Sequence, residues 1–585
     1  MAQKDDISEK SDIGDGHTVP VLEKRQFVIK GDLQFVGEAG HNVKDVTYQN
    51  VDGAPVEVTN PLGYNVGTWT AFLLNVSMII GTGIFSTPST ILKGTGSVGL
   101  ALIYWVLGYI ITLAEISVFL ELTSYFPSRS GGLVVYLEQA FPKPKYFFPV
   151  AFAFQTVILK FMSSNGFVLA SYIWRLSDRA PKDWELKGVA IAGLTVVALV
   201  VVSNNRFALQ LVNVLGWIKL ATLLFITFSG FAVLGGAFKN VPHPKANFEN
   251  SFEGTSSDAY LISNALVSII FSYGGSTNSF NVANEVQNPI RTIKRTAFGA
   301  VSVVFVLYFL VNIAYFAALP KATILKSNQI TATLYFQTLF GPKAAKGLTI
   351  FPILSAFGNI TSSLIGHSRM IREIGRQGVL PWPKFWVTTK PFGTPAGGIF
   401  TTWLVSVIFV LIPPAGNAFN FVIALQNYPS SFYLTLVTIG LFLIRRQRKK
   451  LGLPRSQFRA WTVVPAFFVL AKVFLLIMPW IPPKAGINAS AFGFFYAASS
   501  LVGLSFILIA FAYYVLWIKI LPRIGNYSVR KVILDLDDGS VAHKLVRVPN
   551  AELDSWDAMH DPAGHSIAES QDLDAEYRIV QENKV

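Results

Sequence analysis

Long apolar runs recur along most of this 585-residue chain, and they limit its fold more than any other feature. A helix needs about 20 apolar residues to cross a bilayer. We identify twelve such runs, near residues 69–92, 98–122, 146–174, 187–203, 208–236, 259–283, 298–319, 344–372, 397–413, 417–444, 460–481 and 491–518. Only 14% of the residues are charged, against about a quarter in soluble domains. The sequence therefore predicts an all-α polytopic membrane protein.

Two of these runs are interrupted by glycines near their middle. The first contains Gly81 and Gly83, with Pro88 just beyond, and the sixth contains Gly274 and Gly275. Glycine and proline weaken a helix, and the freed backbone groups are tolerated in a membrane only against protein or a water-filled cavity. Broken helices in matching positions of two halves are typical of transporter substrate sites. The alternative is a kinked structural helix or a glycine packing face.

Three motifs around these breaks carry a family resemblance. They are IIGTGIFSTP (79–88), FSYGGSTNSFNVANEVQNPIRTIKRT (271–296) and LSAFGNITSSLIGHSRMIREIGRQGVLP (354–381). They resemble the amino acid–polyamine–organocation superfamily, and within it the L-type amino acid transporters and fungal high-affinity methionine permeases, over roughly residues 60–518. The resemblance implies a 5+5 inverted repeat with broken helices 1 and 6, plus two further helices.

The same resemblance implies a function. It is that of a secondary transporter that imports a neutral amino acid, with methionine favoured, by proton-coupled alternating access across a fungal plasma membrane. Two alternatives stay open: an L-type exchanger of broader specificity, and a nutrient receptor that binds an amino acid without moving it. We find no motif for an enzyme, a metal site or a cofactor, and the chain has no cysteine.

The breaks supply candidate groups for an amino acid's charged head. A carboxylate favours the backbone N–H groups at a helix N-terminus, which would come from the first break: Ile80, Gly81, Thr82, Gly83 and Ile84. The ammonium favours carbonyls at the end of a half helix, which would come from the second break: Phe271, Ser272, Tyr273 and Gly274. Phe271 or Tyr273 would also close over the substrate as an aromatic gate, although packing against other helices is the alternative.

Polar residues inside other runs are candidates for a side-chain pocket. They are Ser163, Ser164 and Asn165 in the third run and Ser355 and Asn359 in the eighth. Such residues also serve simply to hydrogen-bond helices together. Ser276 replaces a tryptophan that is usual at this place in L-type transporters, so a preference for bulky substrates is in doubt.

Among the charged residues within the runs, three are candidates for a functional role. Lys219 is far from either interface, where a charge is costly and marks function by default. The resemblance implies that it takes the place of a coupling cation, which predicts proton-coupled or cation-independent transport. A fixed scaffolding charge is the alternative. Glu115 and Lys160 fall outside the family pattern. Either they pair with each other, or Lys160 faces the substrate cavity, or both extend to the interfaces.

Three further charges, Glu121, Arg129 and Glu285, lie in or beside the inner loops and are candidates for an inner-gate charge network. Simple solvation of these groups is the competing interpretation.

Basic residues gather in short loops, at 291–295, 369–384 and 445–450, and the net charge is +14. An even number of spans places both termini on the side of these clusters, which the positive-inside rule makes the cytoplasm. This pattern indicates contact with anionic membrane lipid rather than nucleic acid.

The predicted organisation has three parts: an acidic, largely disordered cytoplasmic tail (1–60), a transporter domain (61–518) and an acidic cytoplasmic C-terminal tail (519–585). Residues 26–36 and 528–534 have the alternation of short strands. Lys4 and Lys10 are possible ubiquitylation sites by resemblance, with ordinary solvation as the alternative. Asn488-Ala489-Ser490 matches a glycosylation sequon.

Overall fold

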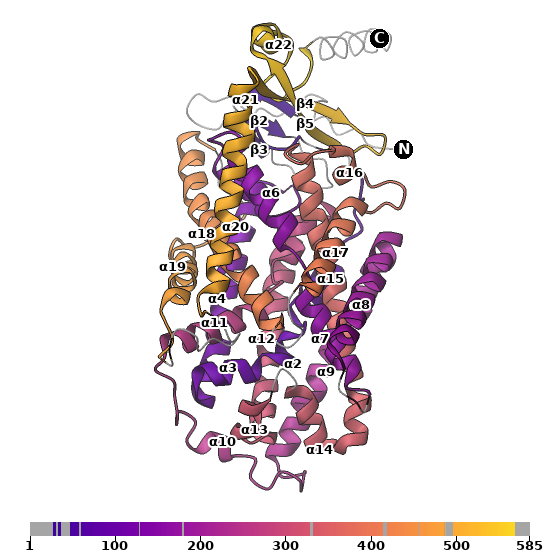
Figure 1. Ribbon diagram of the computed structural model, residues 1–585, viewed down its shortest axis with the longest axis vertical. Coiled ribbons are helices and arrows are strands. Elements are labelled where there is room, and N and C mark those ends of the chain that lie inside the picture. The colour runs from indigo at the N-terminus through magenta and orange to yellow at the C-terminus, as the bar shows by residue number, and fades with distance from the viewer. Residues whose placement is uncertain are drawn as a thin grey trace.

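The computed structural model is a bundle of apolar helices with two small antiparallel sheets at one end (Figure 1). It describes residues 27–30, 33–36, 47–55, 57, 60–127, 129–177, 179, 181–327, 331–412, 418–453, 456–484, 486 and 495–567. Lys4, Lys10 and the sequon at 488–490 lie outside the described residues.

Within the described residues, nine helices are long and apolar enough to cross a membrane: Thr68–Ser86, Val98–Tyr125, Phe147–Trp174, Asp183–Ser203, Asn205–Leu234, Pro289–Ala318, Leu425–Lys450, Val463–Trp480 and Ala498–Ile524. A tenth candidate is a pair bent by 49°, Thr331–Leu348 and Ile350–Arg376, and two shorter apolar helices are Ala259–Ser272 and Ala396–Leu411. In chain order these elements match the twelve predicted runs. The predicted class, a polytopic helical membrane protein, is confirmed.

Two of the predicted runs differ in detail. The third is two helices, α6 (Phe147–Leu159) and α7 (Ser163–Trp174). Side chains satisfy the backbone at this interruption, because Gln426 donates to the carbonyls of Leu159 and Phe161 at 2.8 Å each. The eighth run does not begin at residue 344: that position belongs to α14 (Thr331–Leu348), and α15 spans Ile350–Arg376.

Both predicted interruptions are present. The first span consists of α1 (Thr68–Ile79), α2 (Gly83–Ser86) and α3 (Pro88–Thr95). The sixth consists of α11 (Ala259–Ser272) and the 3₁₀ helix η1 (Asn278–Glu285). The backbone therefore leaves the helical path at residues 80–82 and again at 273–277.

The two breaks lie against each other. A Cβ atom on Gly83 would be 2.9 Å from the Cα of Ser272, and one on Gly275 would be 2.3 Å from the Cγ of Met78. Gly275 also has a φ of +100°, which side-chain-bearing residues rarely adopt. Glycine is thus required at the point where the two interrupted spans meet.

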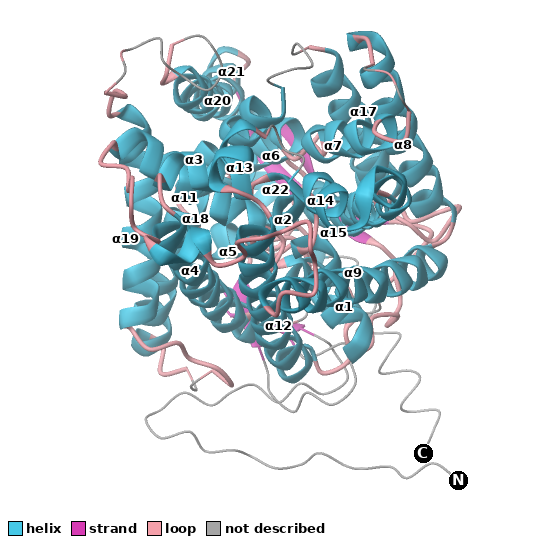
Figure 2. Cartoon of the chain, turned by 90° about the horizontal axis from the view of Figure 1, so that it is seen from below, coloured by secondary structure: helices cyan, strands magenta, loops and turns pink. Residues whose placement is uncertain are grey.

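Other helices surround this centre and are seen end-on in Figure 2. α1 packs on α9 (Asn205–Leu234), α12 (Pro289–Ala318) and α15. The remaining helices are α4 (Val98–Tyr125), α5 (Leu133–Ala140), α8 (Asp183–Ser203), α10 (Ala246–Glu249), α13 (Lys321–Lys326), α16 (Pro383–Val387), α17 (Ala396–Leu411), α18 (Ala418–Lys450), α19 (Val463–Ile477), η2 (Met478–Trp480), α20 (Ala498–Tyr514), η3 (Val515–Ile520), α21 (Leu521–Ile524), η4 (Asn550–Glu552) and α22 (Leu553–Met559).

The strands come from the two terminal segments. β1 (Phe27–Lys30), β2 (Leu33–Val36) and β3 (Thr47–Asn50) pair in that order, with Phe27 opposite Val36 and Leu33 opposite Asn50. β4 (Tyr527–Asp535) and β5 (Val541–Pro549) form a hairpin with Tyr527 opposite Pro549. The run 528–534 therefore lies in β4, and 26–36 includes β1 and β2. Disorder does not extend through the whole N-terminal segment, because Val51 and Ala54 are buried.

Candidate functional site

The break after α1 frees a run of carbonyl groups, because the last turn of a helix has no intrahelical donors for them. Side chains from three other helices satisfy these carbonyls. Lys219 of α9 donates to Ser77 at 2.5 Å, and Tyr308 of α12 donates to Ile79 at 2.8 Å. From α15, Asn359 donates to Met78, and Ser355 lies 3.0 Å from the carbonyls of both Ile80 and Gly81. These carbonyls thus have side-chain hydrogen-bond partners, which backbone groups in a membrane interior require.

The side chain of Lys219 therefore contacts the end of α1, next to the first break. Its side chain is buried and packs on Gly358, where an added Cβ would lie 3.0 Å from the lysine Cε. This position fits both the coupling and the scaffold interpretations. Its role in coupling stays a prediction.

Asn359 and Ser355 were predicted to line a side-chain pocket. In the structure both are hydrogen-bond partners of the break carbonyls, as the interhelical alternative has it, and their part in a side-chain pocket stays a prediction. Of the third-run candidates, Asn165 accepts a hydrogen bond from Thr82 at 2.9 Å. Ser163 and Ser164 are buried at the start of α7.

The second half of the first span contacts the end of α11. The hydroxyl groups of Thr87 and Ser272 are 2.8 Å apart, beside the close approach of Gly83 and Ser272. The predicted carboxylate and ammonium positions are therefore neighbours in space, although the sequence separates them by almost 200 residues.

Tyr273 points into an aromatic cluster. Its hydroxyl donates to the carbonyl of Trp105 at 3.1 Å, and its ring centroid is 5.9 Å from that of Trp105 and 5.6 Å from that of Tyr308. Ser276, three residues further along the chain, is buried. The N–H of Gly274 donates a hydrogen bond to the carbonyl of Phe271 at 3.0 Å. A gating role for Phe271 stays a prediction.

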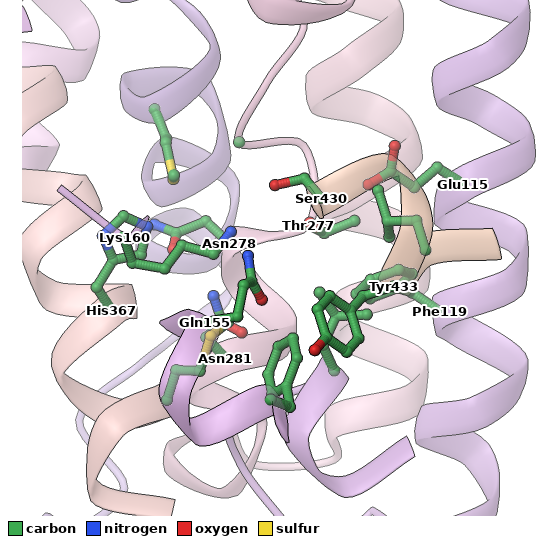
Figure 3. Close-up of a pocket in the computed structure, with 16 residues that line it drawn as sticks. Glu115, Phe119, Gln155, Lys160, Thr277, Asn278, Asn281, His367, Ser430 and Tyr433 are labelled. Carbon is green, nitrogen blue, oxygen red and sulfur yellow. The ribbon is translucent and has the colours of Figure 1, made fainter. Parts of the chain in front are cut away.

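A cavity of about 150 Å³ adjoins both breaks and is lined by Met78 and Gly275 (Figure 3). Its polar lining consists mainly of Glu115, Gln155, Lys160, Asn278, Asn281 and His367. Its apolar lining includes Phe119, Leu133, Phe152, Met370 and Leu434. None of the predicted substrate-binding residues lines this cavity. The two charges outside the family pattern, Glu115 and Lys160, both do.

Glu115 and Lys160 were considered as an ion pair. Among the described residues, the ion pair of Glu115 is with Lys472 of α19, at 4.0 Å. In Figure 3, Lys160 and His367 lie on one side of the cavity, and Glu115, Phe119 and Tyr433 lie on the other. The alternative in which Lys160 faces the cavity therefore matches the structure.

Gln155, Asn278, Asn281 and His367 were not predicted as site residues. A signal was present, since Asn278, Asn281 and His367 fall within the motifs at 271–296 and 354–381. Periodicity could not indicate which of the many polar residues in those motifs turn toward a common space.

The three predicted inner-gate charges do not form one network. Glu121 pairs with Arg445 at 2.6 Å, Arg129 with Glu373 at 2.6 Å, and Glu285 with Arg369 at 2.8 Å. Glu373 and Arg369 both lie on α15, whereas Arg445 lies on α18, and no direct pair joins Glu121, Arg129 and Glu285 to one another among the described residues. Burial lowers the pKa of Arg129, but the carboxylates of Glu373 and Glu138 outweigh it and raise that pKa above its ordinary value.

The Arg129–Glu373 pair extends into the terminal segments, because Glu373 also pairs with Arg376 at 2.7 Å. Arg372 binds Glu57 at 2.5 Å, and Arg376 contacts Glu57 at 3.4 Å while donating to the carbonyl of Val541 at 3.0 Å. Lys531 of β4 donates to the carbonyl of Val51 at 2.5 Å. The end of α15, the segment before α1 and the C-terminal hairpin are thus joined through buried charges.

Comparison with known proteins gives the family. Residues 66–511 match the amino acid permease family. The chain is 34% identical to the high-affinity methionine permease of Saccharomyces cerevisiae, over 83% of this chain and 84% of the relative, and 28% identical to the low-affinity methionine permease of the same yeast, over 84% and 89%. It is 27% identical to the b(0,+)-type amino acid transporter 1 of Mus musculus, over 73% and 85%. The names of all three describe transport proteins rather than enzymes, as predicted for this chain. The chain therefore belongs to the amino acid permease family.

Proposed function

We propose that this permease imports methionine by proton-coupled alternating access. The observation that carries the substrate is the similarity to two yeast methionine permeases, each aligned over more than four fifths of this chain. The two facing breaks with an adjoining cavity support a transport site at the centre of the bundle, where broken helices bind small zwitterions and ions in other transporters.

The buried amine of Lys219 supports coupling of transport to protons. Lys219 lies beneath the first break, where a cation neutralises the carbonyl dipoles that face it. A lysine inside a membrane is a functional position by default. Proton exchange at such a group during the transport cycle would link uptake to a proton gradient.

Orientation and location complete the proposal. The basic end of α18 precedes a short loop, and both described terminal segments lie at one end of the bundle (Figure 1). With the positive-inside rule, this arrangement supports cytoplasmic termini. The similarity to the two yeast permeases supports a fungal plasma membrane as the location. Anionic lipid would contact the basic loops, and ubiquitin ligases would act on the N-terminal tail.

The experiment is uptake of radiolabelled L-methionine into proteoliposomes, with and without an inward proton gradient, in competition with each common amino acid. Empty liposomes are the control. Gradient-driven accumulation that methionine and few other amino acids block is the expected result. Absence of accumulation under a gradient would contradict proton coupling.

The resemblance to L-type transporters keeps exchange as a second candidate. Uptake that requires amino acid preloaded in the lumen would identify an exchanger. Retained binding with no uptake under any condition would identify a receptor and overturn the transport proposal.

A further inference from the structure

The cavity beside the breaks contains buried polar atoms without partners. Within the described residues, Asn278 Oδ1, Gln155 Oε1 and His367 Nδ1 have no hydrogen-bond partner, although each of these side chains lines the cavity and is more than nine-tenths buried. A buried polar atom left unpaired costs about 1–3 kcal/mol. Several around one space indicate that a polar ligand or water fills it.

The charges around the cavity do not balance. Glu115 pairs with Lys472, whose ammonium also lies 5.0 Å from the ring centroid of Phe468. Lys160 lines the same cavity. Among the described residues its ammonium has no direct hydrogen bond or ion pair, and the carboxylate of Glu115 acts on it only from across the cavity. A cation within a membrane protein is normally paired. The cavity therefore lacks one anionic group on the side of Lys160.

Apolar side chains also line the cavity. Phe119 lies across it from Lys160, and Phe152 and Leu434 are further lining residues. A ligand that fits must then combine a carboxylate for Lys160, a hydrogen-bond donor for the unpaired amide oxygens, and an apolar side chain. A zwitterionic amino acid has all three.

We propose that this cavity is a binding site for the zwitterionic head of the transported amino acid, separate from the break residues 80–84. Lys160 binds the α-carboxylate, and Asn278 Oδ1 and Gln155 Oε1 accept hydrogen bonds from the α-ammonium. The side chain lies toward Phe119 and Phe152. The site rests on the proposed function for its ligand, and it adds to that function a second place where the substrate binds, beside the breaks.

The test is a cycle that combines a protein change with a ligand change. We would measure equilibrium binding of L-methionine and of L-methionine methyl ester, which lacks the carboxylate charge, to the full-length purified protein and to Lys160→Met. Both ligands keep the ammonium and the side chain, so a difference between them reports the carboxylate. Such cycles isolate a pairwise interaction.

We expect the wild type to bind the ester about tenfold or more weakly than methionine, since a hydrogen bond to a charged group has about that effect. Lys160→Met should lose about the same factor for methionine and almost nothing for the ester. Equal losses for both ligands in Lys160→Met would overturn the proposal and leave the transport function intact.

Two further variants keep the test decisive. Lys187→Met removes another buried lysine, one that donates to the carbonyl of Leu411 and does not line the cavity, and it should bind both ligands as the wild type does. If Lys160→Met does not fold, Lys160→Gln replaces it under the same criteria. If the wild type binds another amino acid but not methionine, the proposed substrate fails and the cycle is run with that amino acid and its ester; binding of no amino acid overturns both proposals.

Discussion

The ammonium of Lys219 lies 2.5 Å from the carbonyl oxygen of Ser77, the first unpaired carbonyl before the break in the first span. The lysine reaches it from α9 and lies 142 residues further along the chain. A positive charge at this point opposes the negative end of the α1 dipole. The contact therefore predicts that the conformation of the break depends on the ionisation of this side chain.

Lys219→Met should destabilise the protein and abolish uptake. Methionine fills similar space but cannot donate, so the carbonyl of Ser77 is left unsatisfied at a cost of about 1–3 kcal/mol. Thermal unfolding in detergent and uptake in proteoliposomes measure the two effects, with the exposed Lys239→Met as control. Unchanged uptake with unchanged pH dependence would refute both the coupling and the scaffold roles.

Gly83→Ala should separate the two breaks. The new methyl group would lie 2.9 Å from the Cα of Ser272, and a backbone atom cannot rotate away as a side chain can. Overpacking of this kind costs about 1–3 kcal/mol, so we expect a lower unfolding temperature and a loss of transport. Gly299→Ala is the matched control, because the nearest atom to its added Cβ is 3.8 Å away. Equal behaviour of the two variants would show that the close approach is not required.

The fold class was predictable because a membrane span is recognised by a long run of apolar residues, whatever its neighbours in space. The breaks were predictable because two closely spaced glycines weaken a helix in the middle of an apolar run. The cavity was not, since it depends on how helices rotate about their axes. Glu115 and Lys160 stood out as anomalous charges, but nothing in the sequence indicates that Lys472 of the eleventh run turns toward Glu115. The contact between Glu57 and Arg372 joins positions 315 residues apart, and no local pattern indicates it.

Glu57→Ala should loosen the terminal segments from the bundle. The carboxylate is buried between Arg372 and Arg376, and its removal leaves buried cations short of a partner, which costs about 3–5 kcal/mol. Faster proteolysis of the segment before α1 measures the effect. Asp557→Ala, which breaks the exposed pair with Arg530, should have a far smaller effect because solvent screens that pair. Similar proteolysis rates in both variants would contradict a role for the buried pair.

Docking of the C-terminal hairpin should weaken in mild acid through His543. This side chain is buried, and its Nε2 lies 3.1 Å from the carbonyl oxygen of Ala563. Burial, together with the nearby positive charge of Lys531, lowers the pKa of His543 well below its usual range. The folded state therefore binds fewer protons than the unfolded state once the pH is below about 6.5. The stability from this group is complete above pH 6.5 and is lost as the pH falls below it, by up to about 1.4 kcal/mol per pH unit.

Hydrogen exchange in β4 and β5 between pH 7.5 and 5, corrected for intrinsic exchange rates, measures this loss. Asp538 does not interfere in that range. Although burial raises its pKa, hydrogen bonds from the backbone N–H groups of Thr389 and Ser540 hold it at about 2, so its contribution is lost only at lower pH. His543→Gln stays neutral and should make protection nearly independent of pH over this window. Protection that is constant in the wild type, or equally pH-dependent in His543→Gln, would show that another group controls the docking.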